Sequence, residues 1–185
     1  HILIDPVMGD GGNIYRTYSE ELCEKMRILV QHATVITPNL TEALLLLYGE
    51  QGMKEKMELF SQMDETQQLK ETEKSGRELA DRFGLKSIVI TGVDVVCGDG
   101  SVKMGNLVIE ENEADWYFSI KEGGSYSGTG DLFASVLSAG MVKGISMKEC
   151  VQKAIAFLAR AIHDAVLEGT DRNDGVCFEK YLKML

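Results

Sequence analysis

Long apolar runs and proline-rich stretches are both missing from this sequence of 185 residues. No hydrophobic run approaches the roughly 18 residues that a membrane-spanning helix needs, so we expect no membrane partner. The whole chain contains 2 prolines, and it has no internal repeat and no low-complexity tract. Nothing in the composition therefore marks a linker, and we interpret residues 1–185 as a single domain or one lobe of a larger one.

Closely spaced cysteines are also missing. The 4 cysteines lie far apart and form no C-x-x-C pair; they are Cys23, Cys97, Cys150 and Cys177. This spacing excludes the usual zinc-binding patterns and does not resemble a disulfide framework. We interpret the cysteines as reduced thiols of a cytoplasmic protein.

Basic residues are too few to balance the acidic ones. There are 19 lysines and arginines against 29 aspartates and glutamates, which gives a formal net charge of −10. A surface of that sign repels phosphate backbones, so we expect no nucleic-acid partner. A mononucleotide can still bind, because a few local donors and a metal ion can hold it against the overall field. The hydrophobic fraction of 44% is that of a globular protein with a core.

Short apolar runs alternate with longer helical patterns along the chain. The expected strands end at Asp5, Thr37 and Thr91, and two to four further antiparallel strands follow between residues 94 and 121. The expected helices run over residues 19–33, from about 39 to 49, 69–84, 131–142 and 147–167, with a short terminal helix after 175. This order predicts an α/β fold with an open, mainly parallel sheet flanked by helices and a small antiparallel hairpin insertion.

Apolar residues at helical spacing indicate which helix faces are buried. In the helix from Ser19 the expected stripe is Leu22, Met26 and Leu29. In the helix over 147–167 it consists of Val151, Ile155, Leu158, Ile162 and Val166. We expect the methionine-rich stretch that follows Gly49 to be helical in part and exposed.

Polar residues stand where three of the expected strands end, namely Asp5, Thr37 and Thr91. In open α/β sheets the ligand lies beyond the carboxyl ends of the strands, so these side chains are candidates for one binding site. The alternative is that aspartate and threonine are simply common where strands stop.

The stretch "SYSGTGDLF" combines two glycines, a helix start and a carboxylate. Gly128 and Gly130 let the backbone turn tightly and approach a ligand. The first amides of the helix have no partner within the helix, and the helix dipole adds partial positive charge, so Gly128, Thr129 and Gly130 can form an anion hole. Asp131 beside it can take a proton from an attacking hydroxyl. The alternative is a flexible helix entry with a capping aspartate.

The stretch "TPNLTEA" places Glu42 three residues after Asn39. This spacing is a variant of the capping box, in which the two side chains satisfy each other's backbone amides. It is also suited to holding a magnesium ion through water, because hard cations prefer oxygen ligands. The two interpretations do not exclude each other.

The stretch "DPVMGDGGNIYRTY" combines Asp5, Asp10, a glycine run and Tyr15. The glycines could cover a ligand while Tyr15 packs against an aromatic ring. The alternative is a surface turn in which the tyrosine anchors the helix that follows.

The motifs "DPVMGD", "ITPNLTEA", "VITG" and "GTGDLFASVLSAG" occur in an order and spacing that resemble the pyridoxal kinase family of the ribokinase-like superfamily. The resemblance covers the chain from Ile2 to about Gly144. It implies a kinase that uses ATP, Mg²⁺ and K⁺ to phosphorylate the 5′-hydroxymethyl group of pyridoxal, pyridoxine or pyridoxamine.

The resemblance also implies roles for individual residues near the reacting phosphate. Asp131 matches the catalytic base of the family, and Gly128, Thr129 and Gly130 match its anion hole. Asn39 and Glu42 match the motif that organises magnesium and phosphate.

The remaining candidates match the nucleotide side of the family's site. Asp5, Thr37 and Thr91 fall where the family has contacts to the nucleotide phosphates and a monovalent cation, and Asp5 is also a candidate metal ligand. Asp10 and Tyr15 match the loop that folds over ATP and substrate.

Two alternatives stay open. Hydroxymethylpyrimidine kinases share "DPVM" and "TPN" but usually carry cysteine where Asp131 stands, and a nucleotide-binding fragment without activity would carry the same motifs. The residues of this chain match the family only after its N-terminal region, so we expect this sequence to be the later, nucleotide-binding part of a ribokinase-like domain. We expect the full-length protein to be a homodimer.

Overall fold

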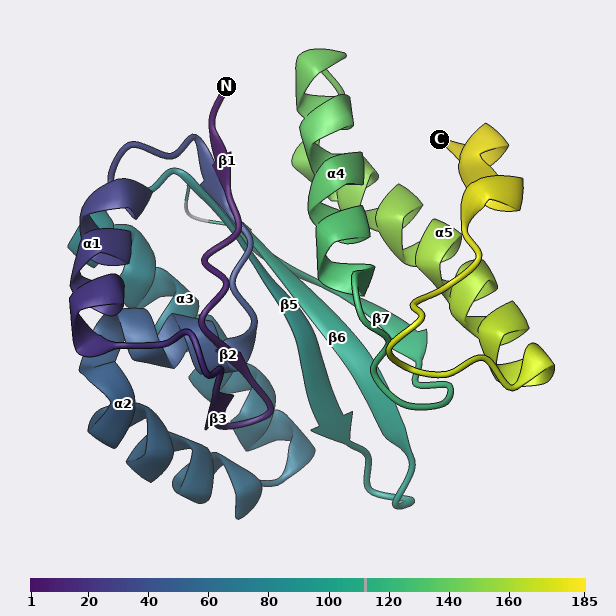
Figure 1. Ribbon diagram of the computed structural model, residues 1–185. Helices are drawn as coiled ribbons and strands as arrows, with labels where there is room; N and C mark the ends of the chain where they lie inside the picture. The colour runs from purple at the N-terminus through teal and green to yellow at the C-terminus, as the bar shows by residue number, and fades with distance from the viewer. Residues whose placement is uncertain (112) are drawn as a thin grey trace. The chain divides into compact units, whose positions relative to one another are not determined.

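The computed structural model describes residues 1–111 and 113–185, which form two compact units, His1–Trp116 and Tyr117–Leu185. The strands are β1 (Leu3–Ile4), β2 (Gly9–Asp10), β3 (Asn13–Ile14), β4 (Val35–Ile36), β5 (Ser87–Val96), β6 (Val102–Glu110) and β7 (Glu113–Ile120). The helices are α1 (Glu20–Val30), α2 (Leu40–Ser61), α3 (Glu65–Phe83), α4 (Thr129–Val142), α5 (Met147–Glu168) and the 3₁₀ helix η1 (Glu179–Met184) (Figure 1).

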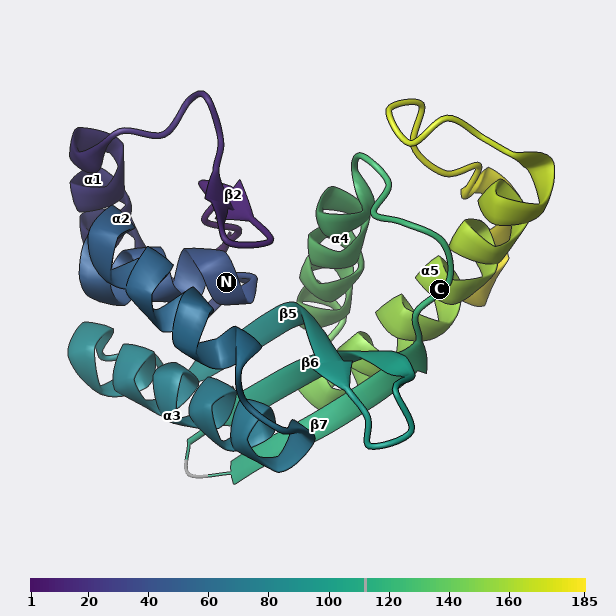
Figure 2. The same cartoon turned by 90° about the horizontal axis from the view of Figure 1, so that it is seen from below.

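The main sheet has five strands in the order β1-β4-β5-β6-β7. Strands β1, β4 and β5 are parallel to one another, while β6 runs antiparallel to β5, and β2 and β3 form a separate antiparallel hairpin. Helices α1, α2 and α3 lie on one side of these strands (Figures 1 and 2). The α/β class, the parallel strands flanked by helices and the antiparallel insertion after residue 94, to which β6 belongs, are therefore confirmed. The β2–β3 hairpin was not predicted.

The sequence suggested that this strand ends at Thr91, but strand β5 continues to Val96. The pairing with β6 shifts between Ile90 and Val93, which marks a bulge. Gly92 adopts a φ of 64°, a conformation that glycine reaches without strain, and its amide donates to the buried side chain of Asn106 over 3.2 Å. Thr91 therefore lies at a bend within β5, next to a backbone amide that has a buried hydrogen-bond partner.

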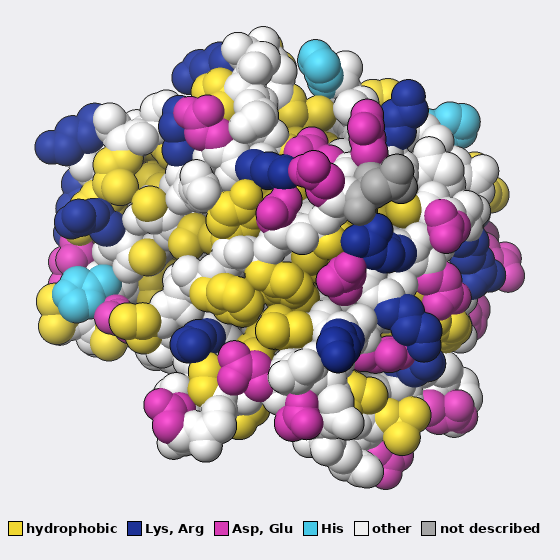
Figure 3. All heavy atoms as spheres, turned by 180° about the vertical axis from the view of Figure 1, so that it is seen from behind, with side chains coloured by type: hydrophobic (Ala, Val, Ile, Leu, Met, Phe, Trp, Pro, Cys, Tyr) yellow, Lys and Arg dark blue, Asp and Glu magenta, His cyan; other side chains and the backbone are white. Residues whose placement is uncertain are grey.

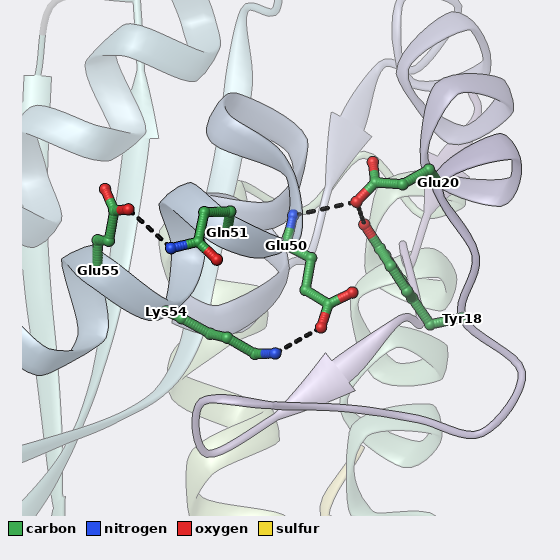
Figure 4. Close-up of polar contacts among 6 residues, drawn as sticks. All are labelled: Tyr18, Glu20, Glu50, Gln51, Lys54 and Glu55. Carbon is green, nitrogen blue, oxygen red and sulfur yellow. Dashed lines mark hydrogen bonds and ion pairs between the residues drawn. The ribbon is translucent and has the colours of Figure 1, made fainter.

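Gly49 does not end helix α2 but interrupts it, with φ 71° and ψ −174°. The helix restarts because Glu20 Oε1 accepts the amide of Glu50 over 3.3 Å and also the hydroxyl of Tyr18 over 2.9 Å (Figure 4). The methionine-rich stretch after Gly49 is thus helical to Ser61. The expectation that this stretch is exposed is wrong for Met53, which is fully buried in the core of the first unit.

The interruption leaves carbonyl groups of the first half of α2 without helical partners. Arg27 on α1 donates through Nε to the carbonyl of Leu46 over 2.7 Å and through Nη2 to that of Leu45 over 2.9 Å. Arg82 on α3 donates to the carbonyl of Leu47. Two arginines from the flanking helices therefore compensate for the kink.

The buried faces of two helices match the stripes that the sequence suggested only in part: Val151 and Leu158 of α5 are buried as expected, but Leu29 of α1 and Val166 of α5 are exposed. In α1 the buried residues are Cys23 and Val30, while Leu29 is 49% exposed, because Cys23 faces the carbonyl of Leu45 on α2. In α5 the buried residues are mostly small, and they are Met147, Cys150, Val151, Ala154, Phe157, Leu158, Ala161 and Ala165. Small side chains allow helix backbones to approach closely, so the alanine face packs inward and Val166 stays exposed.

Helix α3 begins four residues earlier than expected because Asp64 and Gln67 form a capping box. No helix within residues 1–111 and 113–185 has the length and apolar character to cross a membrane. Acidic and basic side chains are interspersed on the face shown in Figure 3.

Candidate functional site

The polar residues that follow the parallel strands meet at one edge of the sheet. Thr37, after β4, is buried and donates its hydroxyl to Asp5 Oδ1, after β1, over 2.9 Å. Thr91, at the bulge of β5, donates its amide to the carbonyl of Pro38 over 2.9 Å and pairs with Asn39. The structure thus places Asp5, Thr37, Thr91 and the start of α2 side by side.

Glu42 lies at this edge and is 3% exposed. Its Oε2 accepts the amide of Asn39 over 2.9 Å, and Asn39 Oδ1 accepts the amide of Glu42 over 2.9 Å, so the capping box is present. Its Oε1 accepts the amide of Met8 over 3.1 Å. Burial raises the pKa of Glu42 to about 8, and the negative charge of Asp5 adds to this rise, while the backbone amides act in the opposite direction.

The glycine run after Asp5 forms the turn of the β2–β3 hairpin, with φ 55° at Gly11 and 77° at Gly12. The hairpin is fastened to the start of α2 at two points. Asn39 Nδ2 donates to the carbonyl of Gly9 over 2.8 Å, and the amide of Gly12 donates to Thr41 Oγ1 over 2.9 Å. Thr41 is a site residue that the sequence did not reveal, because its partner lies 29 residues away.

Asp10 and Tyr15 belong to this hairpin. Asp10 is exposed, and its Oδ1 accepts the amide of Gly11 over 2.9 Å. Tyr15 is 43% exposed, and its amide donates to the carbonyl of Met8 over 3.0 Å. Partial burial raises the pKa of Tyr15, and the charges of Asp10, Glu42 and Asp5 raise it further. The tyrosine therefore lies within electrostatic reach of the carboxylates at the strand ends.

In the second unit, Gly128 forms the N-cap of α4 with a φ of 81°, and no side chain caps this helix. The carbonyl of Gly128 accepts the amide of Leu132 over 3.0 Å, so the helix begins at once. A β-carbon at Gly128 or Gly130 would meet no atom within 4 Å. Asp131 is exposed in the first turn. Open space thus faces an uncapped helix N-terminus, which is the arrangement of an anion site.

The predicted site residues divide between the two units. The first unit brings together Asp5, Asp10, Tyr15, Thr37, Asn39, Glu42 and Thr91, and the second holds Gly128, Thr129, Gly130 and Asp131. Among the residues that the structure describes, no group of three or more His, Cys, Asp or Glu side chains could hold a metal ion by itself. The hard oxygens of Asp5 and Glu42 nevertheless suit a magnesium ion that retains water ligands.

The chain is similar to known kinases in sequence and in structure. The phosphomethylpyrimidine kinase family matches residues 1–175. A pyridoxine/pyridoxal/pyridoxamine kinase of Bordetella avium is 29% identical over 164 residues, which cover 87% of this chain and 49% of that protein. The chain therefore spans about half the length of this curated relative.

Many solved structures are similar to the chain, including the following two. One, from Bacteroides thetaiotaomicron, is assigned as a phosphomethylpyrimidine kinase and contains pyridoxal; it has a TM-score of 0.81 and 30% identity over 98% of this chain and 59% of its own. The other is the pyridoxal kinase of Leishmania donovani in complex with ADP and pyridoxine, with a TM-score of 0.64 and 28% identity over 89% of this chain and 52% of its own. The chain belongs to the phosphomethylpyrimidine kinase family, and its similarity to pyridoxal kinases of the ribokinase-like superfamily is confirmed.

Proposed function

We propose that this chain is the nucleotide-binding part of an ATP-dependent kinase that phosphorylates the 5′-hydroxymethyl group of a vitamin B6 compound. The observation that carries the proposal is the uncapped start of α4, where Gly128, Thr129 and Gly130 lead directly to an exposed Asp131. The similar proteins named for pyridoxal, pyridoxine and pyridoxamine support the choice of substrate.

The glycines at the start of α4 suit the binding of a phosphoryl group. The first amides of a helix point at the space beyond its N-terminus, and the helix dipole favours negative charge there. A β-carbon at Gly128 or Gly130 would meet no atom within 4 Å, so a phosphoryl group can approach the backbone there. The amide of Thr129 also donates to the carbonyl of Tyr126 over 3.4 Å, a long contact that a phosphoryl oxygen would compete with. A loose transition state needs such alignment and charge neutralisation more than it needs a strong base.

Asp131 would receive the proton of the attacking alcohol. In the proposed reaction the hydroxyl oxygen of the vitamin forms a bond to the γ-phosphorus of ATP. The bond from that phosphorus to the bridging oxygen of ADP breaks, and the hydroxyl proton passes to the Asp131 carboxylate. Asp131 lies in the first turn of α4, directly after the amides that would hold the phosphoryl group.

The first unit supplies groups for the nucleotide phosphates and their cations. Asp5 and Glu42 would hold Mg²⁺ through water, with Asn39 keeping Glu42 in place. Burial raises the pKa of Glu42 to about 8, and the charge of the ion would act against that rise by favouring the ionised carboxylate. The ion supplies positive charge that offsets the charge of the phosphates. Thr37 and Thr91 belong to the same edge of the sheet and would contact the phosphates or a K⁺ ion, while Asp10 and Tyr15 of the hairpin would face the nucleotide.

Replacing Asp131 with asparagine tests the role of the base. In the full-length protein we expect Asp131→Asn to lower kcat by at least about 100-fold, the lower end of the usual contribution of a general base. The affinity for ATP and the melting temperature should stay close to those of the wild type, because the side chain is exposed.

The matched control is Glu149→Gln, which removes an acidic side chain from the first turn of α5 instead. It should leave kcat unchanged. Turnover of Asp131→Asn at the wild-type rate would show that another group accepts the proton.

A second candidate substrate is the hydroxymethylpyrimidine of thiamin synthesis, which the family description favours. A substrate panel measured with the full-length protein distinguishes the two. Higher kcat/KM for pyridoxal, pyridoxine or pyridoxamine supports our proposal, and a preference for the pyrimidine over all three overturns it. Binding of Mg·ATP without turnover of either class would identify a nucleotide-binding protein.

A further inference from the structure

The segment that leads into α4 is held in place by the loop that follows α5. Arg172 donates through Nε to the carbonyl of Ser125 over 2.7 Å and through Nη2 to the hydroxyl of Ser125 over 3.1 Å. The amide of Ser127 donates to the carbonyl of Arg172 over 2.9 Å. We propose that Arg172 is a positioning residue that sets the orientation of the anion hole; this inference rests on the function proposed above.

Tyr126 connects these contacts to the helix. It is 8% exposed and packs in a small core with Ala161, Ala165 and Val176. Its carbonyl accepts the hydroxyl of Thr129 over 3.0 Å. Three consecutive residues before Gly128 are therefore held in place, the first and third by Arg172 and the second by burial, and Thr129 at the start of α4 is bonded to the second of them.

Glycines let the two loops approach each other closely. A β-carbon at Gly124 would lie 3.2 Å from Nε of Arg172, and one at Gly175 would lie 3.0 Å from the carbonyl oxygen of Ser127. Gly175 also has a φ of 78°, which favours glycine. These two close approaches mean that the loop after α5 packs directly against residues 124–127.

Positioning matters for this chemistry because phosphoryl transfer depends on alignment more than on covalent participation of the protein. A displacement of about 1 Å at the reacting groups can lower a rate by about 100-fold. Arg172 itself donates to Ser125, so its effect on the reaction would pass through the backbone of residues 125–128 and not through contact with the phosphate.

Substitution of Arg172 in the full-length protein tests the proposal. We expect Arg172→Ala to lower kcat by about 10- to 100-fold and to change KM for the alcohol substrate by less than about two-fold. Arg172→Lys keeps the charge but cannot reproduce the planar two-donor contact, so it should remain impaired. Arg160→Ala, which removes an exposed arginine from α5, is the control and should keep wild-type kcat.

A glycine pair tests the same contact from the opposite loop. Gly175→Ala and Gly169→Ala each place a methyl group at a positive φ, of 78° and 65° respectively. Only the first of these methyl groups meets the Ser127 carbonyl, since nothing lies within 4 Å at Gly169. We expect kcat to fall in Gly175→Ala and to stay near the wild-type value in Gly169→Ala.

Hydrogen exchange separates this inference from the proposed function, because it needs no substrate. In Arg172→Ala the amides of residues 125–131 should exchange faster than in the wild type, while those of α2 should not change. Unchanged exchange in this segment overturns the positioning role, and so does faster exchange with unchanged kcat and KM. If the wild-type protein phosphorylates none of the B6 compounds, the proposed function fails, and the exchange rates alone decide whether Arg172 holds the segment.

Discussion

At the scale of single residues, Glu42 combines two opposing influences on one carboxyl group. Three backbone amides, those of Met8, Gly9 and Asn39, favour its ionised form, but burial outweighs them and raises its pKa to about 8. The capping box of α3 has Gln67 at the equivalent position, where its Oε1 accepts the amide of Asp64 over 3.0 Å. An amide side chain can therefore serve in the same geometry.

The raised pKa of Glu42 should make the free energy of unfolding depend on pH. The folded protein keeps a proton on Glu42 up to about pH 8, whereas the unfolded chain releases it near the ordinary pKa of 4.5. Stability should therefore fall as pH rises between these values, by about 1.36 kcal/mol for each unit of pKa difference. In Glu42→Gln this contribution is lost, so the unfolding free energy should depend less on pH.

Urea unfolding at pH 5 and pH 8.5, followed by circular dichroism, measures the difference. We expect the Glu42→Gln variant to gain stability relative to the wild type as the pH is raised. Parallel changes in the two proteins would mean that Glu42 is ionised in the folded state at neutral pH.

At the scale of elements, helix α2 contains one position, residue 49, whose backbone conformation suits only glycine. The φ of 71° and ψ of −174° at Gly49 lie in a region that other residues rarely adopt. Arg27, Arg82 and Glu20 supply the hydrogen bonds that the interruption removes. The kink in α2 is thus stabilised by hydrogen bonds from both neighbouring helices, α1 and α3.

Alanine at Gly49 should lower the unfolding free energy by about 2–3 kcal/mol, because the conformation is strained for any side chain. The matched control is Gly84→Ala at the end of α3, where φ is 67° and ψ is 32°. That left-handed helical conformation costs an alanine only about 1 kcal/mol. A β-carbon meets ordinary contacts or none at both sites, so equal losses in urea unfolding would contradict the backbone explanation.

At the scale of the whole molecule, the net charge of −10 opposes the approach of a nucleotide that is itself negative. We expect the association rate of a fluorescent ATP analogue with Mg²⁺ to rise when ionic strength increases from about 0.01 M to about 0.15 M, because salt screens the repulsion. Stopped-flow fluorescence measures this rate. A fall with added salt would show that local positive charge steers the ligand in spite of the overall field.

Features that depend on neighbouring residues in the sequence were predicted well. The helix caps at Ser19 and Asn39 and the extent of α5 agree with the structure, because a cap needs only a side chain and an amide two or three residues away. The order of the longer strands and helices followed from hydrophobic periodicity for the same reason, but the two-residue strands β2 and β3 were not predicted.

Features that depend on distant partners could not be predicted. The sequence contains no sign that Thr41 bonds Gly12 or that Arg172 bonds Ser125, because these pairs are 29 and 47 residues apart. Leu29 was assigned to the buried face of α1, but packing against α2 selected Cys23. Oligomeric state belongs with these features, and a homodimer of the full-length protein stays a prediction.

The fastening of the β2–β3 hairpin has a consequence for how a ligand would come and go. A loosely held hairpin can move on the nanosecond scale, but the β2–β3 hairpin would first have to break two hydrogen bonds, one from Gly12 to Thr41 and one from Asn39 to Gly9. Because both anchors belong to the first turn of α2, any departure of the hairpin must be concerted with loosening of that turn. Opening of the hairpin would then be a rare collective event, and a ligand covered by the hairpin would bind and leave at the slower rate of that event.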